Sequence, residues 1–121
     1  MSAEKSSHAM LVIEDDQQLG ETLARHFETE GYKVSLANTG HEGITLAMTA
    51  RPSLILLDIQ LSDASGLDVL VSLREKARTQ HITVMVMAGR QDALLQNKAL
   101  EAGAQDFIEK PIDLDILTLR V

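Results

Sequence analysis

The sequence predicts an α/β domain built on a single doubly wound parallel sheet. Five short β-type segments alternate with five helical segments. The strands start at residues 10, 33, 54, 83 and 106, so they are 23, 21, 29 and 23 residues apart, the period of strand–helix units rather than of hairpins. The 121 residues, of which 45% are hydrophobic and 24% charged, have the size and balance of one globular domain.

The five predicted strands differ in how their apolar residues are arranged. Met10–Ile13, Leu54–Leu57 and Thr83–Met87 are nearly continuous apolar runs, typical of parallel strands buried on both faces. Lys33–Ala37 instead alternates polar and apolar residues, which suits a strand at the edge of the sheet. The fifth strand is predicted at Asp106–Ile108.

Apolar residues at helical spacing predict amphipathic helices between the strands. The residues expected to face the core are, in chain order, Leu19, Leu23 and Phe27, then Ile44, Ala47 and Met48, then Leu67, Leu70 and Val71, then Leu95, Ala99 and Ala102. Gly31 and Gly103 follow the first and fourth helices as C-terminal stops. A last helix is predicted within Asp113–Val121 with no Gly or Pro after it, and we expect this domain to be cut from a longer protein.

Composition narrows the classes of function. The polar segment Met1–Ala9 lacks the apolar core of a secretory signal and is expected to be a flexible N-terminal extension. The absence of cysteine excludes disulfides and thiolate metal sites, and no apolar run is long enough to cross a membrane, so we expect a cytoplasmic domain. A net charge of −7 and only 2% aromatic residues argue against direct binding to nucleic acid or to anionic membranes.

Acidic residues follow two of the predicted buried strands. Glu14-Asp15-Asp16 comes directly after the first strand, and Asp58 directly after the third. Because the carboxyl ends of parallel strands meet at one edge of the sheet, these carboxylates should crowd into one crevice. Such crowding is unfavourable unless a cation or raised pKa values relieve it, and Mg²⁺ prefers oxygen ligands of this kind. Lys110, after the fifth strand, could supply a positive charge aimed at an anion held by the metal.

Asp58 ends an apolar run in which a buried carboxylate would be costly, so its side chain should face the crevice. There it could ligate a metal or act as a nucleophile toward phosphorus. The alternative is a simple turn-forming role at the end of a strand. For Glu14, Asp15 and Asp16 the alternative is the first turn of a helix, where acidic residues favour the dipole, and Asp16 is the predicted N-cap.

Three motifs resemble those of a response-regulator receiver domain. They are Leu11–Asp16, the apolar run into Asp58 with Gly66 eight residues on, and Lys110-Pro111. They occur in order on the expected elements, and the resemblance covers about Met10–Val121. It implies a flavodoxin-like fold with strand order 2-1-3-4-5 and a signalling domain rather than an enzyme.

The resemblance also implies a role for each residue at the strand ends. Asp58 would be the phosphoacceptor, and Lys110 would contact the phosphoryl group. Mg²⁺ would be the cofactor, bound by Asp58, directly by Asp15, through water by Glu14 and by the backbone carbonyl of Gln60. The peptide between Lys110 and the proline that follows would be cis, a state readily available only to X–Pro bonds.

The partners that the resemblance implies belong to a two-component phosphorelay. The phosphoryl donor would be a phosphohistidine on a histidine kinase or a phosphotransfer protein. A homodimer could form through the face made by the fourth helix, the fifth strand and the fifth helix. The terminal segment from Lys110 to Val121 is similar to receivers joined to a nucleotide cyclase or sitting in a hybrid kinase, and the output stays open.

The chain departs from the family at its switch residues. Met87 stands where receivers usually carry Ser or Thr, whose hydroxyl bonds to the phosphoryl group, and a thioether has no proton to donate. The Ala88 amide would still contact the phosphate. Phe107 matches the rotating aromatic of the family, and we expect Met87 to hold its ring in one rotamer. Ser62 replaces a usual proline, and Gly89 replaces an often acidic or polar residue.

Three other readings compete with a phosphorylated receiver. A pseudo-receiver would be a binding module on the same surface with weakened or phosphate-independent switching, and Met87 favours it. A phosphohydrolase with an Asp nucleophile would need a second acid two residues later, which Asp58-Ile59-Gln60 lacks. A flavodoxin-type cofactor binder would cradle a phosphate in its first loop, where Glu14-Asp15-Asp16 would repel one.

Overall fold

A computed structural model describes residues 8–121 and confirms a five-stranded parallel sheet in the order β2-β1-β3-β4-β5. The strands are β1 (Ala9–Ile13), β2 (Lys33–Ala37), β3 (Leu54–Asp58), β4 (Thr83–Ala88) and β5 (Asp106–Glu109). The helices are α2 (Gln17–Thr29), α3 (Gly40–Ala50), α4 (Gly66–Glu75), α5 (Ala93–Glu101) and α6 (Leu114–Arg120). A short 3-10 turn, η1 (Arg90–Asp92), which the sequence pattern did not predict, precedes α5.

The predicted strands are present, and four of them are one residue longer than expected. β1 begins at Ala9, and the Lys33 amide donates a hydrogen bond to the carbonyl of His8 (2.9 Å). Those two residues, assigned to the N-terminal extension, therefore pair with the sheet, whereas residues 1–7 of that extension lie outside the described residues. β3 extends through Asp58, which places the candidate nucleophile on the sheet itself. β2 lies at an edge, as its alternating pattern predicts.

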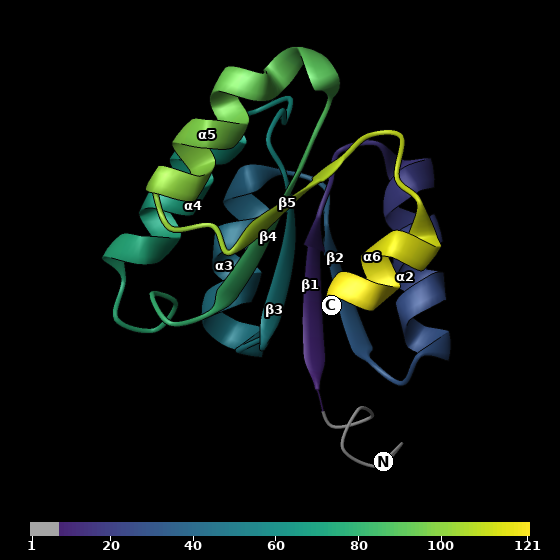
Figure 1. Ribbon diagram of the computed structural model, residues 1–121. Coiled ribbons are helices and arrows are strands. Elements are labelled where there is room, and N and C mark those ends of the chain that lie inside the picture. Colours follow the sequence, from purple (N-terminus) through teal and green to yellow (C-terminus); the bar gives the residue numbers. More distant parts are fainter. Residues whose placement is uncertain (1–7) are drawn as a thin grey trace.

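Helices cover both faces of the sheet (Figure 1). On one face, under α3, α4 and α5, lie inward-pointing residues of the central strands: Leu11, Ile13, Ile55, Leu57, Val84 and Val86. On the other, under α2 and α6, lie Met10, Val12, Leu54, Leu56, Met85, Met87 and Ile108. Because successive side chains of a strand point to opposite faces, each central strand contributes to both clusters, which explains its continuous apolar run.

The predicted core stripes are confirmed for most helices. Leu23 and Phe27 of α2, Ala47 of α3 and Ala99 of α5 are buried. The prediction for Val71 is wrong: its side chain is 40% exposed. Leu70 is buried as predicted, and the other buried residues of α4 are Gly66, Val69 and Leu73. Residues of a helix that face the core recur every three or four positions, so Leu73, and not Val71, continues the stripe after Leu70.

Local signals place the helix ends. The carboxylate of Asp16 accepts a hydrogen bond from the Leu19 amide (3.2 Å). Asp16 is therefore the N-cap of α2, as predicted. Gly31 and Gly103 adopt φ values of 99° and 110°, which only glycine reaches without strain. Among residues 8–121, no helix combines the length and apolar content needed to span a bilayer.

Candidate functional site

Three carboxylates meet at the carboxyl edge of the sheet. Ile13 of β1 pairs with Leu57 of β3, so the residues that follow them, Glu14 and Asp58, lie side by side. Glu14 is fully buried, Asp58 is 4% exposed and Asp15 is exposed. One oxygen from each of the three lies within 4.8 Å of the others. The predicted acidic crevice is therefore present.

Lys110 brings a positive charge to these carboxylates from the end of β5. Its Nζ lies 3.1 Å from Glu14 Oε1 and 3.2 Å from Asp58 Oδ2. The Lys110 amide donates to the carbonyl of Ala88 (2.8 Å), which fixes the start of this segment against β4. The Lys110–Pro111 peptide is cis, as the sequence resemblance implied.

Burial and charge shift the pKa values of two of these groups. Burial, together with the neighbouring Asp58 carboxyl, raises the pKa of Glu14 from 4.5 to about 7, although the Asp16 amide and Lys110 act in the opposite direction. Burial lowers the pKa of the Lys110 ammonium, but the carboxylates of Asp58 and Glu14 outweigh that effect and raise it above its ordinary value. Lys110 is therefore held in its charged form, and its ammonium group pairs with both buried carboxyls.

The loop after β3 shapes the floor of the site. The Gln60 amide donates to Asp58 Oδ1 (3.2 Å), and the Gly66 amide donates to the Ile59 carbonyl (2.7 Å). A Cβ atom on Gly66 would lie 2.3 Å from the carbonyl oxygen of Asp58 and 2.5 Å from Cα of Ile59. Glycine at position 66 thus lets α4 begin directly against the backbone that carries Asp58.

A pocket of about 410 Å³ opens beside these groups, lined by Asp58, Gln60, Gly89, Gln91, Asp92, Lys110 and Pro111. Its residues come from the end of β3 and from the loops after β3, β4 and β5. Carboxylate oxygens from Glu14, Asp15 and Asp58 are the hard ligands that Mg²⁺ prefers, and one exposed acid beside two buried ones leaves a side open to water. The donor set therefore fits a magnesium ion.

Comparison with known proteins agrees with this geometry. The family model for the response regulator receiver domain matches residues 10–121. This chain belongs to the response regulator receiver domain family. The transcriptional regulatory protein CusR of Escherichia coli K12 is 36% identical over 112 residues, 93% of this chain and 48% of CusR. The acid tolerance regulatory protein ActR of Rhizobium meliloti is 35% identical over 107 residues, 88% of this chain and 54% of ActR.

Solved receiver domains share the fold closely. The receiver domain of the TMAO respiratory system response regulator TorR superposes with a TM-score of 0.85 at 33% identity, covering 93% of this chain and 92% of that one. A two-component response regulator from Clostridium difficile gives a TM-score of 0.87 at 26% identity, covering 94% and 92%. This receiver domain spans about half the length of the curated relatives it matches.

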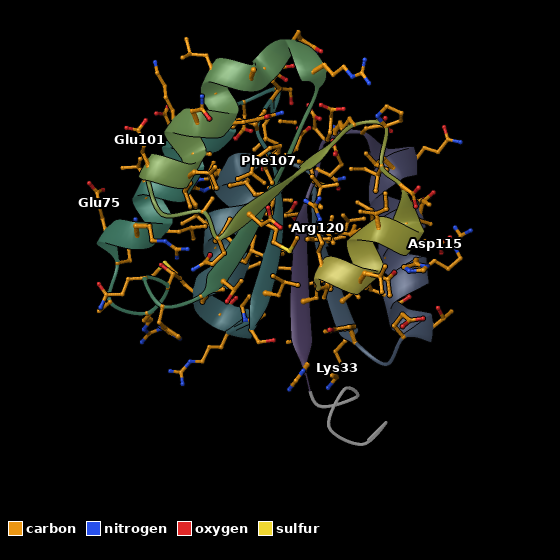
Figure 2. All side chains as sticks on the ribbon, in the orientation of Figure 1. Lys33, Glu75, Glu101, Phe107, Asp115 and Arg120 are labelled. Carbon is orange, nitrogen blue, oxygen red and sulfur yellow. The ribbon has the colours of Figure 1, made fainter. Side chains whose placement is uncertain are left out.

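Met87 and Phe107 lie in different layers of the receiver. Met87 pairs with Asp58 across the strands, is fully buried and packs in the cluster under α2 and α6. Phe107 pairs with Val86 and packs against the cluster under α3, α4 and α5 (Figure 2). The expectation that Met87 holds the Phe107 ring is therefore wrong, because the two side chains leave adjacent strands toward opposite faces.

Two buried polar residues were not predicted from the sequence: Asp92, which lines the pocket, and Gln96 of α5. Asp92 is 6% exposed and Gln96 is 7% exposed. Asp92 accepts hydrogen bonds from the Gln60 side chain (2.9 Å) and the Gly89 amide (3.1 Å), while Gln96 donates to the Gly89 carbonyl (3.2 Å). An acid three residues after a glycine, at the start of a helical stretch, could have indicated the contact with Gly89. Nothing in the local pattern indicates the contact with Gln60.

Proposed function

We propose that this receiver accepts a phosphoryl group on Asp58 in a Mg²⁺-dependent reaction. The observation that carries the proposal is the position of Asp58: a nearly buried carboxylate at the end of β3, 3.2 Å from the Lys110 ammonium and beside two further acids. A carboxylate so placed can react with phosphorus while a fixed cation compensates the charge that arrives.

Different residues of the chain would bind the metal ion, attack phosphorus and neutralise the phosphoryl oxygens. Glu14, Asp15, Asp58 and the backbone carbonyl of Gln60 would hold the ion, which supplies charge neutralisation at the phosphoryl oxygens. An oxygen of Asp58 forms a bond to phosphorus as the bond between phosphorus and the donor's imidazole nitrogen breaks on the opposite side. Lys110 would neutralise one of the phosphoryl oxygens. The Ala88 amide, expected to contact another, instead faces β5 in the ladder that pairs Ala88 with Glu109. The receiver contributes positioning and charge, and the donor contributes the high-energy bond.

The proposed donor is a histidine kinase or a phosphotransfer protein. Membership of the receiver family supports this class of partner. The curated relatives CusR and ActR, named as regulatory proteins, are about twice as long as the matched region. We expect the receiver to act in the cytoplasm, with a transcriptional or other output that lies outside its own fold.

A second copy of the receiver is the proposed occupant of the face formed by α5, β5 and α6. Large apolar side chains are exposed on both helices, with Leu94 at 68%, Ile116 at 47% and Leu119 at 87%. Exposed apolar area of this kind is stabilised by association. Sedimentation with and without beryllofluoride, which imitates a phosphoryl group, should show dimers in wild type that Leu119→Ser weakens; a monomer in both conditions would reject this interface.

Labelling with acetyl phosphate tests the phosphoacceptor. Wild type should become labelled only with Mg²⁺, whereas Asp58→Asn should not, because the amide is no nucleophile. Asp68→Asn is the matched control, since Asp68 is exposed on the first turn of α4. Asp15→Asn should lose both Mg²⁺-dependent NMR shifts and labelling. Labelling of Asp58→Asn at the wild-type level would place the nucleophile elsewhere.

A pseudo-receiver is the second candidate, and Met87 is the observation that favours it. The Met87 side chain is fully buried and has no proton to donate to a phosphoryl group. Phosphorylation would therefore favour the active form over the inactive form by less than in a receiver with Ser or Thr at this position. The same labelling experiment separates the two functions. A wild-type chain that binds Mg²⁺ but takes no label would support the binding module.

A further inference from the structure

Asp92 is a buried carboxylate that the proposed phosphoryl transfer does not use. It ends the turn η1 and lines the pocket beside Asp58. Its Oδ1 accepts a hydrogen bond from Gln60 Nε2 at 2.9 Å, and its Oδ2 accepts one from the Gly89 amide at 3.1 Å. Both donors are neutral. These bonds offset the cost of burying the carboxylate, so its place depends on both partners.

The turn from β4 into α5 is held at both backbone groups of Gly89. Asp92 binds its amide, and the side chain of Gln96, one turn into α5, donates to its carbonyl (3.2 Å). These contacts are local to the turn and its helix. The bond from Gln60 is different, because Gln60 lies in the loop after β3, 32 residues earlier in the chain.

Gln60 also contacts the candidate phosphoacceptor. Its amide donates to Asp58 Oδ1 (3.2 Å) while its side chain donates to Asp92. A path of hydrogen bonds therefore runs from the Asp58 carboxylate through Gln60 and Asp92 to Gly89. Met87, the strand partner of Asp58 on β4, has no donor with which to make a parallel side-chain path.

We propose that Asp92 is a positioning residue that holds the Gln60 side chain and the Gly89 amide together, and so couples the loop after Asp58 to the start of α5. A change of charge or ligation at Asp58 alters its hydrogen bond with the Gln60 amide and so moves Gln60. Because the Gln60 side chain is bonded to Asp92, this movement is passed on to Asp92. Coupling of this kind needs two arrangements of the link with different energies for each state of Asp58. That use of the link rests on the proposed function, whereas the link itself does not.

The link is tested in the metal-free protein, with no phosphoryl chemistry. Exchange of the Gln60 side-chain amide protons with water, measured by NMR, should be about tenfold slower than that of Gln91. Gln91 lines the same pocket, and its side chain makes no hydrogen bond within residues 8–121. Asp92→Ala should raise the Gln60 rate to that of Gln91. Equal rates for the two side chains in wild type would overturn the proposal.

Coupling to α5 is tested with Gln60→Met, which keeps the length of the side chain and removes its donors. Gln60 is exposed, so the variant should fold. Hydrogen exchange at the Gly89 amide should rise several-fold in Gln60→Met and stay unchanged in the matched control Gln91→Met. An unchanged Gly89 rate in Gln60→Met would overturn the coupling, whether or not Asp58 accepts a phosphoryl group.

A third experiment tests whether a change at Asp58 reaches α5. Mg²⁺ and beryllofluoride are added at saturating concentrations, so that wild type and variants are compared in the fully bound state. Amide shift changes in α5 should fall to less than half of the wild-type values in Gln60→Met, while those next to Asp58 persist; Gln91→Met should respond like wild type. A full α5 response in Gln60→Met would reject the relay. Wild type that binds no beryllofluoride would instead reject the phosphoacceptor function, and the exchange rates would still decide the link.

Discussion

We predict that Met87 limits the response of this receiver to phosphorylation at Asp58. The two residues pair across β3 and β4, and Met87 is fully buried. Met87→Thr should place a hydroxyl near the phosphoryl group, and one charge-assisted hydrogen bond of roughly 1.5–3 kcal/mol would enlarge the population shift by about tenfold or more. The measurement is the change in amide NMR shifts next to Asp58 and along β4 on adding beryllofluoride, compared between wild type and variant.

The same substitution should lower stability, because it removes buried apolar volume. A loss of about 2–4 kcal/mol is expected for shortening a buried methionine. Met85→Thr is the control, since Met85 lies on the same strand and in the same cluster but pairs with Leu56 rather than with Asp58. It should lose stability without gaining a response. A wild-type response as large as that of Met87→Thr would mean that another group has taken the place of the hydroxyl.

The connection from β3 to α4 depends on one glycine. A Cβ atom at position 66 would meet the backbone of Asp58 and Ile59, which cannot move aside without moving the phosphoacceptor. Gly66→Ala should therefore lower the free energy of unfolding by roughly 1–3 kcal/mol in a urea titration and weaken Mg²⁺ binding. Gly20→Ala in α2 is the control, because its Cβ would meet only the flexible side chain of Leu36 (2.9 Å) and helix propensity favours alanine. Equal losses in both variants would contradict the backbone argument.

Arg74, near the end of α4, links the turn that precedes β4 to the segment that precedes β5. Its guanidinium, whose pKa burial lowers, donates to the carbonyls of Gln80, Ile82 and Gly103 and to the side chain of Gln105. Arg74→Lys should cost about 2 kcal/mol of unfolding free energy, since one ammonium cannot span these acceptors. Arg78→Lys is the matched control, because Arg78 is exposed and has no side-chain hydrogen bond within residues 8–121. A similar loss in both variants would count against this role of Arg74.

Elements with a strong local signal were predictable, and contacts between loops were not. The run Leu54–Leu57 identified a central strand because a strand buried on both faces must be apolar throughout. Asp16 and Gly31 identified helix ends because their effects act on neighbouring backbone. Val71 was misplaced because one apolar residue at the margin of a helical stripe fits either edge of it. The bond between Gln60 and Asp92 depends on the relative position of two loops, which no local pattern encodes.

The whole fold is needed to assemble the candidate site. Glu14 and Lys110 are 96 residues apart, yet the sheet order brings the ends of β1, β3 and β5 within reach of one ammonium group. The sequence predicted this gathering because parallel strands share one carboxyl edge. It could not predict the full burial of Glu14, or the layers that separate Met87 from Phe107, because these depend on packing across the sheet.

The burial of Glu14 should make the stability of the metal-free receiver depend on pH. Its pKa is about 7 in the folded state and near 4.5 when the chain unfolds, so between these values the folded state holds a proton that the unfolded state has lost. This contribution to stability is fully present below pH 4.5 and disappears as pH rises through 7. Relative to Glu14→Gln, wild type should lose about 2–4 kcal/mol between pH 4.5 and 8.

Urea unfolding of both proteins in EDTA measures this difference, because the other titrating groups are common to the two. Parallel pH profiles for wild type and Glu14→Gln would show that the buried carboxyl is not the cause. Saturating Mg²⁺ favours the ionised carboxylates and should flatten the wild-type profile. At pH 8 an ion concentration a hundredfold above its dissociation constant should add about 2.7 kcal/mol to wild type. The gain should vanish in Asp15→Asn, since the metal that offsets the crowded charges then loses its exposed ligand.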